Sequence, residues 1–483
     1  MTEVLETPAA QPVSGVRTPP LAAVLAAVGI PMFMVVLDNL VVTNALPVIR
    51  TELNASLSDL QWFINAYTLS FASLLLTASA LGDRLGRRRL FLIGIALFTA
   101  ASAACAMATE PWMLILFRAI QGFGGAAVMP LSLTLLSAHV PEKMRSAAIG
   151  IWGGITGLGV ALGPVVGGAV VDGLSWQWIF WLNVPIGILA LPFVARVLSE
   201  SFGSARRLDV VGLLLSAGGV LAVVWGVIHG ADDGWTSTPV LGGLLGGAAL
   251  LAAFVVWELR VAEPMLPLRL FRSRGFSAIN TVNFAFSLGV FGSIFLLSQY
   301  FQVVQGYTPL ESGIRTMPWT MAPMVVAPIA GLLVDKVGPR VLVVVGQVFL
   351  AAALGWMALI AEVDVSYSSF VLPFILGGVG MGLTFAPAST VVMASASEED
   401  RGMASGTSST VREVGVAMGV AVLASVFASR GGYGTPQTYV DGLAPAVAVG
   451  AAIVAVGALI ATLIPGRKAI AAELGDGATE LVH

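Results

Sequence analysis

The sequence is poor in charge. Only 11% of its 483 residues are Asp, Glu, Lys or Arg, whereas soluble domains carry roughly 25%. Hydrophobic residues make up 57% of the chain, which is difficult to reconcile with a water-soluble globule. The net charge of −3 provides no positive excess for binding nucleic acid. These shortages predict an integral membrane protein embedded in a lipid bilayer.

Metal ligands and catalytic groups are also scarce. Cys105 is the only cysteine, which excludes an intramolecular disulfide, a cysteine-ligated zinc site and an iron–sulfur cluster within one chain. His139, His229 and His483 have no metal-ligand spacing. No GxxxxGK[ST] phosphate loop occurs, so no ATP hydrolysis is encoded. We therefore expect no metal, no cofactor and no enzyme activity, and we expect an ion gradient to supply any energy.

What the sequence does contain is a series of long apolar stretches separated by short polar breaks. A helix needs about 20 apolar residues to cross roughly 30 Å of hydrocarbon. We predict fourteen transmembrane helices. Their expected ranges are 21–47, 58–81, 88–108, 111–136, 146–171, 178–198, 208–230, 238–258, 276–302, 312–334, 339–361, 368–394, 402–429 and 441–465. An even number places both termini on the same side of the membrane.

The basic residues predict which side that is. The stretch LGDRLGRRRL at 81–90 sets four arginines between two apolar segments. Each would cost about 2.5–3.5 kcal/mol at the bilayer centre, and basic loops favour the cytoplasm. With fourteen helices, the lysines and arginines fall on the cytoplasmic side with five exceptions. Arg50, Arg315 and Arg430 fall outside, and Arg118 and Arg412 fall within spans. We therefore expect both termini to be cytoplasmic.

The first basic loop is repeated later in the chain. It contains Gly82, Asp83, Arg84, Gly86 and Arg87, and GLLVDKVGPR at 331–340 repeats the order with Asp335, Gly338 and Arg340. Repetition on this scale favours a transporter built from two halves. The simpler alternative is a basic loop that does no more than set the topology.

The two loops resemble the G-x-L-a-D-r-x-G-r-k loop between helices 2 and 3 of the major facilitator superfamily. The first copy has Ser79 in place of the leading glycine, and the second has Pro339 as its departure. The resemblance implies an all-α major facilitator fold that works by alternating access. It also implies that these residues form a conformational gate rather than a path for protons.

The fifth predicted span carries a glycine pattern. Gly150, Gly159, Gly163, Pro164, Gly167 and Gly168 match the superfamily's antiporter signature, g-x8-G-x3-G-P-x2-G-G, at every defined position. Glycines four residues apart predict close packing against another helix, and a proline permits a bend. Ordinary small-residue packing is the alternative. Within the family, the signature marks exporters and antiporters.

Charged residues inside the spans predict a coupling site. LDNLVVTNALP at 37–47 resembles the first-helix motif of the fourteen-helix drug:proton antiporter branch, and Asp38 is its carboxyl. Loss of hydration favours the neutral form of such a group, so it can bind a proton reversibly. LILFRAIQGFGGAA at 114–127 resembles the fourth-helix motif, and this implies a role for Arg118 in proton coupling. Because a guanidinium keeps its charge, Arg118 must be paired or hydrated; a purely structural ion pair is the alternative.

Glu413 is the third candidate for proton coupling. It stands beside Arg412 where the family more often has glutamine or asparagine. It could titrate, it could compensate the charge of Arg412, or it could contact cationic substrates. Neighbouring helical residues point about 100° apart, so the two side chains need not pair.

The sequence divides into two halves around an inserted helix pair. We predict a disordered cytoplasmic tail at 1–20, a six-helix bundle at 21–200, the inserted pair at 201–260, a cytoplasmic linker at 261–275, a second six-helix bundle at 276–466 and a tail at 467–483. Substrate-binding residues are not identifiable among the many aromatic and methionine side chains.

The predicted function is proton-coupled export of drugs, antibiotics or other toxic small molecules across a bacterial cytoplasmic membrane. The resemblance implies cargo that is hydrophobic or cationic, protons as the second substrate and no obligate protein partner. One alternative is a dedicated exporter of a single metabolite, such as an amino acid, a siderophore or a self-made antibiotic. Another is a membrane receptor that transports nothing.

Overall fold

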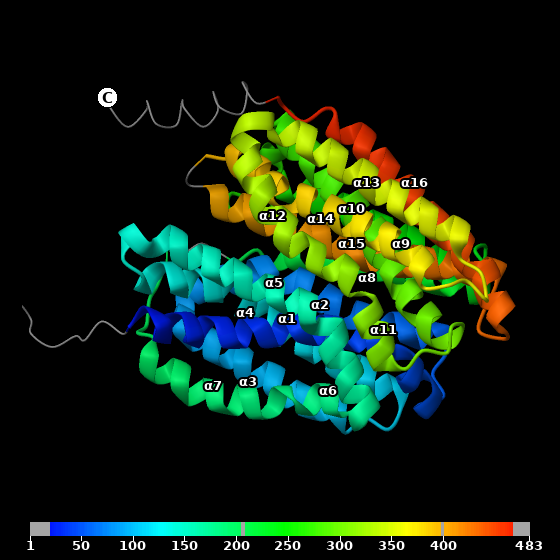
Figure 1. The fold of residues 1–483 in the computed structure, drawn as a ribbon. Helices are drawn as coiled ribbons and strands as arrows, with labels where there is room; N and C mark the ends of the chain where they lie inside the picture. The colour runs from blue at the N-terminus through cyan, green and yellow to red at the C-terminus, as the bar shows by residue number, and fades with distance from the viewer. Residues whose placement is uncertain (1–19, 204–207, 398–399, 467–483) are drawn as a thin grey trace, which may run out of the picture.

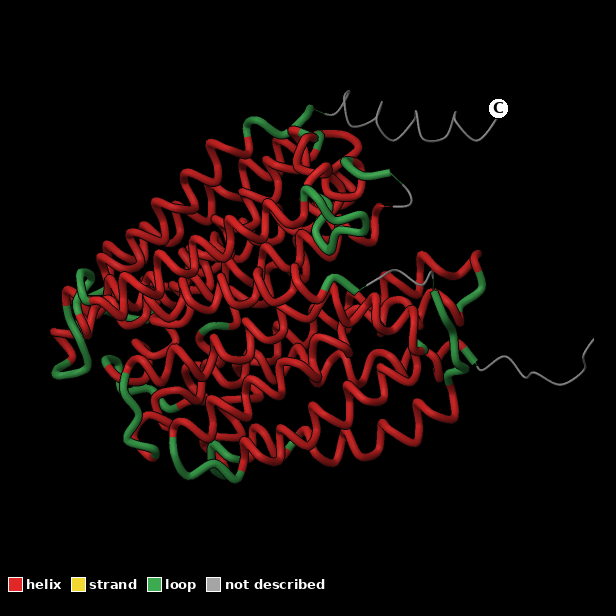
Figure 2. The backbone as a smooth tube through the Cα atoms, turned by 180° about the vertical axis from the view of Figure 1, so that it is seen from behind, coloured by secondary structure: helices red, strands yellow, loops and turns green. Residues whose placement is uncertain are grey.

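The computed structural model describes residues 20–203, 208–397 and 400–466. Secondary structure in these residues is helical throughout, without a strand (Figures 1 and 2). Residues 1–19 and 467–483, which hold the two predicted tails, lie outside the described residues.

Fourteen described segments are long and apolar enough to cross a membrane, which confirms the predicted count. The helices are α1 (Leu21–Glu52), α2 (Leu57–Leu85), α3 (Arg87–Ala106), α4 (Pro111–His139), α5 (Glu142–Gly173), α6 (Trp178–Trp181), α7 (Asn183–Val197), α8 (Val210–Asp233), α9 (Thr238–Glu258), α10 (Arg274–Val303), α11 (Pro309–Arg315), α12 (Met317–Val337), α13 (Pro339–Ile360), α14 (Ser368–Ala394), α15 (Arg401–Arg430) and α16 (Pro436–Ala461). A short 3-10 helix at Leu268–Arg272 precedes α10.

Two of the predicted spans are each interrupted once. The sixth span divides into α6 and α7 at Leu182, and the tenth begins as the short helix α11, which ends before α12 at Thr316. Pro185 and Pro318 follow these breaks and lack the backbone N–H that would continue the helical hydrogen bonds. The breaks therefore lie where the sequence removes a backbone donor.

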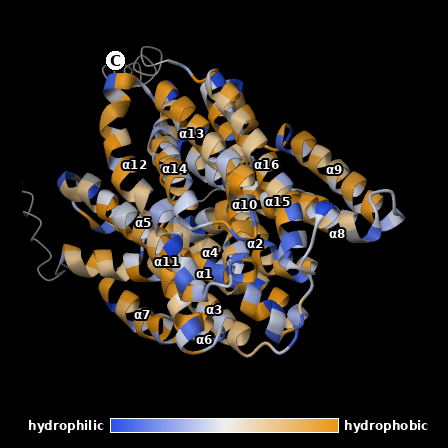
Figure 3. Cartoon of the chain, turned by 45° about the vertical axis from the view of Figure 1, so that its right-hand side comes forward, coloured by the Kyte–Doolittle hydropathy of each residue, from blue (hydrophilic) through white to orange (hydrophobic). Residues whose placement is uncertain are grey.

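The helices form two groups that lie side by side (Figure 1). In one group α4 packs on α2 and α3, while α1 packs on α5; in the other α10 packs on α15 and α16, and α13 packs on α14. Helix α8 contacts both groups, because Val224 and Ile228 share an apolar cluster with Leu69 of α2 and Ala417 of α15. Helix α9 packs on the outer side of α8 (Figure 3).

Large apolar side chains cover much of the exterior. Leu189 is 71% exposed, Leu332 78% and Leu359 84%. Apolar residues recur along the outward surfaces of the long helices (Figure 3). In water such a surface would cause aggregation, whereas hydrocarbon chains solvate it at no cost. The exterior is therefore that of a membrane-embedded bundle.

The two copies of the basic loop have the same backbone conformation. Gly86 joins α2 to α3 with φ 109°, and Gly338 joins α12 to α13 with φ 91°. These angles favour glycine, because a Cβ would be strained there. The repeat in sequence is thus a repeat in structure. We call the end of the molecule that carries these two turns the basic end.

Candidate functional site

Asp38 and Arg118 form an ion pair inside the first group of helices. Asp38 comes from α1 and Arg118 from α4, and Oδ2 of the carboxylate lies 2.6 Å from Nη1 of the guanidinium. The exposed fractions of the two side chains are 1% and 0%. In the sequence, both are charged residues within apolar spans, and the structure shows that they are partners.

Three neutral side chains complete the hydrogen bonding of this pair. Gln121, one turn after Arg118, donates to Asp38 Oδ1 at 3.0 Å and accepts from Arg118 Nη1 at 2.6 Å. Asn183, at the start of α7, donates to the same Oδ1 at 2.7 Å. Ser102 of α3 accepts from both amides, at 3.2 Å and 3.0 Å. The Asp38 cluster, as we call these five residues, therefore joins four helices.

The rest of the guanidinium is held by α2. Arg118 Nε donates to the carbonyl oxygen of Phe63 at 3.1 Å. The Tyr67 ring lies under the guanidinium, 4.2 Å from its central carbon to the ring centroid. Nη2 has no hydrogen-bond partner among the described residues, so the face of an aromatic ring is a principal contact for the remaining positive charge.

This arrangement ties the charge of Asp38 to the packing of its helices. Arg118 cannot lose its proton, so protonation of Asp38 would leave a buried cation without its counter-charge. Such a state is strongly unfavourable in a low-dielectric interior. Since neither side chain reaches solvent here, binding or release of a proton requires the helices around the cluster to rearrange.

Glu413 does not belong to the Asp38 cluster. It lies on α15, where its Oε1 is 3.6 Å from Nη2 of Arg412, and its side chain is 13% exposed. The two neighbours therefore contact each other, as local charge compensation requires.

Three glycines of the antiporter signature pack α5 against α1. A Cβ on Gly159 would lie 3.0 Å from Val36 Cγ1, one on Gly163 2.7 Å from Leu40 Cβ, and one on Gly167 3.0 Å from Val41 Cα. Their contacts on α1 extend to either side of Asp38. The pattern therefore sets how closely α5 approaches the helix that carries the buried carboxyl.

The end of the signature contacts the second group of helices. Gly168 lies against the backbone of Pro309 and Leu310. Asn44 Nδ2 donates to the carbonyl oxygens of Pro164, at 3.0 Å, and Pro309, at 2.8 Å. The two groups are therefore closed together at the end of the molecule opposite the basic end.

Toward the basic end, four glycines of α5 have open space beside them. Gly150, Gly153, Gly154 and Gly157 have nothing within 4 Å of the position of a Cβ. Contact between α5 and α12 is made further along, where Thr320 Oγ1 donates to Ala161 O at 3.3 Å. On this side the hydrogen bonds between the two groups lie at Ala161 and beyond it, away from the basic end.

The first basic-loop motif makes its polar contacts within its own group of helices. Asp83 Oδ1 lies 2.6 Å from Arg87 Nε, and the Asp83 carbonyl accepts from Gly203 N at 3.0 Å. The Glu200 carboxylate accepts from the backbone N–H groups of Arg88, at 2.8 Å, and Arg89, at 3.1 Å. An acid at a helix N-terminus stabilises the helix, because it satisfies free donors and opposes the helix dipole.

The remaining motif residues are placed as follows. Gly82 packs on Leu131 of α4, and Arg84 is exposed. In the second copy Gly338 forms the turn described above, and Arg340 is exposed at the start of α13. Asp335 belongs to α12, and its side chain lies outside the part of the chain that the structure describes.

A small polar cavity lies in the second group, between α10, α14 and α15. Asn283, Ser389, Ser405, Ser408 and Arg412 line it with apolar neighbours. Its volume of about 70 Å³ is far below the roughly 300–1,000 Å³ of sites that enclose a drug-sized ligand. In this conformation it can accept one functional group or a few waters.

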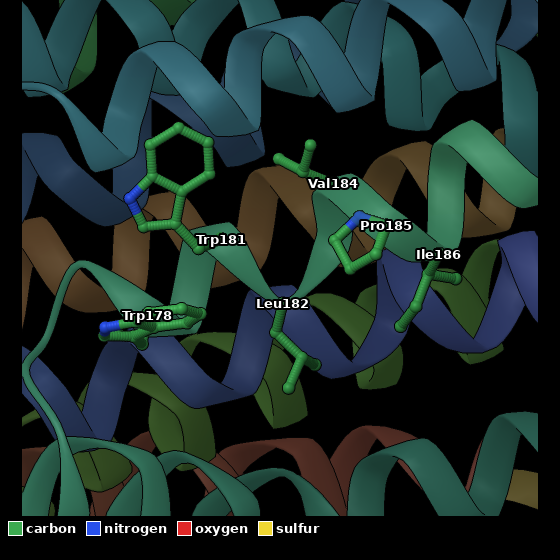
Figure 4. Close-up of a pocket in the computed structure, with 6 residues that line it drawn as sticks. All are labelled: Trp178, Trp181, Leu182, Val184, Pro185 and Ile186. Atoms are coloured by element: carbon green, nitrogen blue, oxygen red, sulfur yellow. The ribbon is translucent and has the colours of Figure 1, made fainter.

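An apolar groove lies on the surface of α6 and α7. Trp178, Trp181, Leu182 and Pro185 line it with Val184 and Ile186 (Figure 4). Its neighbour Asn183 is buried and bonds Asp38. The groove suits contact with lipid acyl chains, while the same segment supplies a polar group to the interior.

Comparison with known proteins agrees with this architecture. The family model described as Major Facilitator Superfamily matches residues 28–420. The chain belongs to this superfamily. It is therefore a membrane transporter with fourteen candidate spans and not an enzyme.

Curated relatives of this superfamily member include bacterial resistance proteins. It is 40% identical over 408 residues to the multidrug resistance protein Stp of Mycobacterium tuberculosis, covering 84% of this chain and 75% of that protein. It is 35% identical over 438 residues to the tetracenomycin C resistance and export protein of Streptomyces glaucescens, covering 90% and 81%. The chain is thus related to drug and antibiotic efflux proteins.

A solved structure confirms the fold. An inward-facing, unoccupied bacterial homologue of the human lysosomal transporter Spinster superposes with a TM-score of 0.66 at 16% identity, covering 95% of this chain and 99% of that one. At this identity the likeness shows the major facilitator fold alone.

The sequence did not reveal several residues of the site. Asn183 occurs in WQWIFWLNVPIG, but nothing in that stretch shows that it reaches α1. Tyr67 stands in an apolar helix with no charged neighbour in sequence. Glu200 is separated by 112 positions from Arg88, whose backbone it bonds. A polar residue inside an apolar span was the available signal for Asn183.

Proposed function

We propose that this transporter exports drug-like small molecules in exchange for protons, with Asp38 as the principal proton carrier. The observation that carries the proposal is the enclosed Asp38–Arg118 pair, in which the negative charge of the carboxylate offsets the positive charge of the guanidinium. A carboxyl that gains a proton there releases Arg118 from its counter-charge. The change in charge is thereby converted into a change in helix packing.

Arg118 acts in this scheme as a fixed cation that keeps Asp38 ionised until the site opens. Gln121 and Asn183 orient the carboxylate, and the Tyr67 ring packs on the guanidinium. The glycines of the antiporter signature allow α1 and α5 to slide at close range. Glu413 has a supporting role, either as a second titrating group or as a contact for cationic cargo.

We further propose that the basic end faces the cytoplasm and that the conformation described is open toward it. The open space beside Gly150, Gly153, Gly154 and Gly157 and the contacts of Asn44 and Gly168 at the other end support this orientation. Tags placed after Gly230 should react from outside intact cells. Tags at 260–275 should react only after permeabilisation, and the reverse pattern would refute the orientation.

Transport in proteoliposomes tests the coupling directly. A fluorescent lipophilic cation serves as cargo, and an internal pH dye reports proton movement. Wild-type protein should exchange protons for cargo across the membrane, whereas Asp38→Asn should lose gradient-driven transport. Glu413→Gln is the comparison variant, because it removes the other candidate carboxyl, which lies outside the Asp38 cluster. Normal proton exchange in Asp38→Asn together with its loss in Glu413→Gln would assign the coupling to Glu413.

The rival functions make different predictions in the same assay. A dedicated metabolite exporter would exchange protons only with its own compound, so a broad drug panel would give no signal beyond one chemical class. A receptor would give no flux with any compound. The names of the curated relatives favour drug or antibiotic cargo, since they include multidrug and single-antibiotic resistance proteins.

A further inference from the structure

A second pair of acidic side chains meets at the base of the inserted helices, far along the chain from Asp38. Asp209 immediately precedes α8, and Glu258 is the last residue of α9. Glu258 is only 4% exposed. The two carboxyl groups lie beside each other, since Asp209 Oδ2 and Glu258 Oε1 both approach the position that a Cβ on Gly212 would take.

One oxygen of each carboxyl already has partners. Asp209 Oδ1 accepts from Gly212 N at 2.8 Å and from Trp257 Nε1 at 2.8 Å. Glu258 Oε2 accepts from Leu266 N, in the linker that leads to α10, at 3.1 Å. These contacts join the start of α8, the end of α9 and the linker.

The other oxygen of each carboxyl is buried without a donor. Asp209 Oδ2 and Glu258 Oε1 have no hydrogen-bond partner among the described residues. Both oxygens crowd the position that a Cβ on Gly212 would take, and Glu258 Oε1 is 2.8 Å from it. Two ionised carboxylates in this position would repel each other and would each lack a donor.

Among the described residues, which do not include 204–207, no ion pair joins a basic side chain to Asp209 or Glu258. The ion pairs formed by arginines in the described segments involve other acids. The charged group that acts on Glu258 is Asp209, and the other contacts are backbone groups of Met265 and Leu266. Two buried carboxyl oxygens that both lack a donor can share one proton.

We propose that Asp209 and Glu258 bind a single proton between them and so latch the base of the inserted helix pair to the linker. One carboxyl donates its O–H to the free oxygen of the other, which remains ionised. Release of the proton to water breaks that O–H and leaves two facing anions. This proton site is separate from Asp38 and does not depend on the proposed function.

The latch is placed to act on both groups of helices. Helix α8 packs on α2 and α15. In the linker, Met265 Sδ accepts from Thr77 Oγ1 of α2 at 3.8 Å. Loss of the proton would loosen α8, α9 and the linker together at the basic end. The folded pair holds a proton that separated carboxyls would have lost, so its stabilisation is present at lower pH and is lost as pH rises through the titration of the pair.

Amide variants test this proposal on the full-length protein in detergent. In Glu258→Gln and in Asp209→Asn, an N–H takes the place of the shared O–H, so the latch persists without a proton. The unfolding temperature of wild-type protein should fall between mildly acidic and mildly alkaline pH. Each variant should lose most of that fall. Infrared spectra should show the loss of one protonated-carboxyl band in both variants.

Glu52→Gln is the matched control. Glu52 Oε2 accepts from the indole of Trp176 at 2.8 Å, as Asp209 does from Trp257, but Glu52 is exposed. This variant should keep both the pH dependence and the infrared band of wild type. Identical spectra and pH profiles in wild type and Glu258→Gln would overturn the proposal. Stabilisation of wild type alone by added sodium or calcium would overturn it in favour of a cation site.

Discussion

Arg118 Nη1 lies 2.6 Å from Asp38 Oδ2, and both side chains are closed to solvent. The structure shows that Asp38→Asn would leave a buried guanidinium without its counter-charge. Breaking such a pair costs about 3–5 kcal/mol.

The first prediction follows from this pairing. Asp38→Asn should lower the unfolding temperature, and the double variant Asp38→Asn/Arg118→Met should recover much of the loss, because no unpaired charge remains. Neither variant should couple cargo to protons. Thermal unfolding in detergent and proton flux in proteoliposomes measure the two effects. A double variant less stable than Asp38→Asn would contradict the ion-pair argument.

A second prediction concerns Asn183. Asn183→Ala removes one of the two amide donors to Asp38 Oδ1 and to Ser102, while Gln121 keeps its bonds to both; losing a hydrogen bond to a charged group costs about 1.5–3 kcal/mol. Asn65→Ala is the control, since both polar atoms of that buried side chain have no partner among the described residues. We expect a clear drop in unfolding temperature for the first variant and a smaller one for the second. Equal drops would show that Asn183 acts through packing alone.

The third prediction concerns the closure opposite the basic end. Gly168→Ala would place a methyl group against the backbone of Pro309 and Leu310 and separate the two groups of helices there. Gly173→Ala, on the same helix, meets nothing within 4 Å. Distances between spin labels at that end should lengthen in Gly168→Ala and stay unchanged in Gly173→Ala, with export at least several-fold slower in the former. Unchanged distances in Gly168→Ala would refute the contact's role.

Asp83 provides a fourth prediction. Its ion pair with Arg87 is partly exposed, with 24% and 21% of the side chains accessible, and such pairs contribute about 0–1 kcal/mol. Asp83→Asn should therefore hardly change thermal stability, yet slow export if the loop is a gate. Flux rate against protein amount in the membrane measures this. Normal flux would leave the motif with a topological role only.

The membrane spans could be predicted because apolar length is a local property of the sequence. The interruption at Leu182 was also within reach, since Pro185 cannot continue the helical hydrogen bonds. The closure at Asn44 was not, because it depends on the carbonyl oxygens of Pro164 and Pro309, which carry no side-chain signal. Contacts between distant helices are properties of the packed chain, as the Glu200 cap on α3 also illustrates.

The candidate site was predictable where its residues are unusual for a membrane. A carboxyl at 38 and a guanidinium at 118 are costly enough in hydrocarbon to be noticed singly. Their pairing needed the fold, because 80 positions separate them. Neutral partners such as Ser102 and Gln121 cost little to bury and do not stand out in the same way.

The position of α8 against both α2 and α15 has a mechanical consequence. A helix that adheres to both moving bodies on one flank acts as a hinge, and the opposite flank, at α5 and α12, is then free to swing. The two groups would therefore move apart further on the α5 and α12 side than on the α8 side. Cargo would enter from the α5 and α12 side. Shortening the linker after Glu258 would restrict movement at the α8 hinge without changing either group of helices.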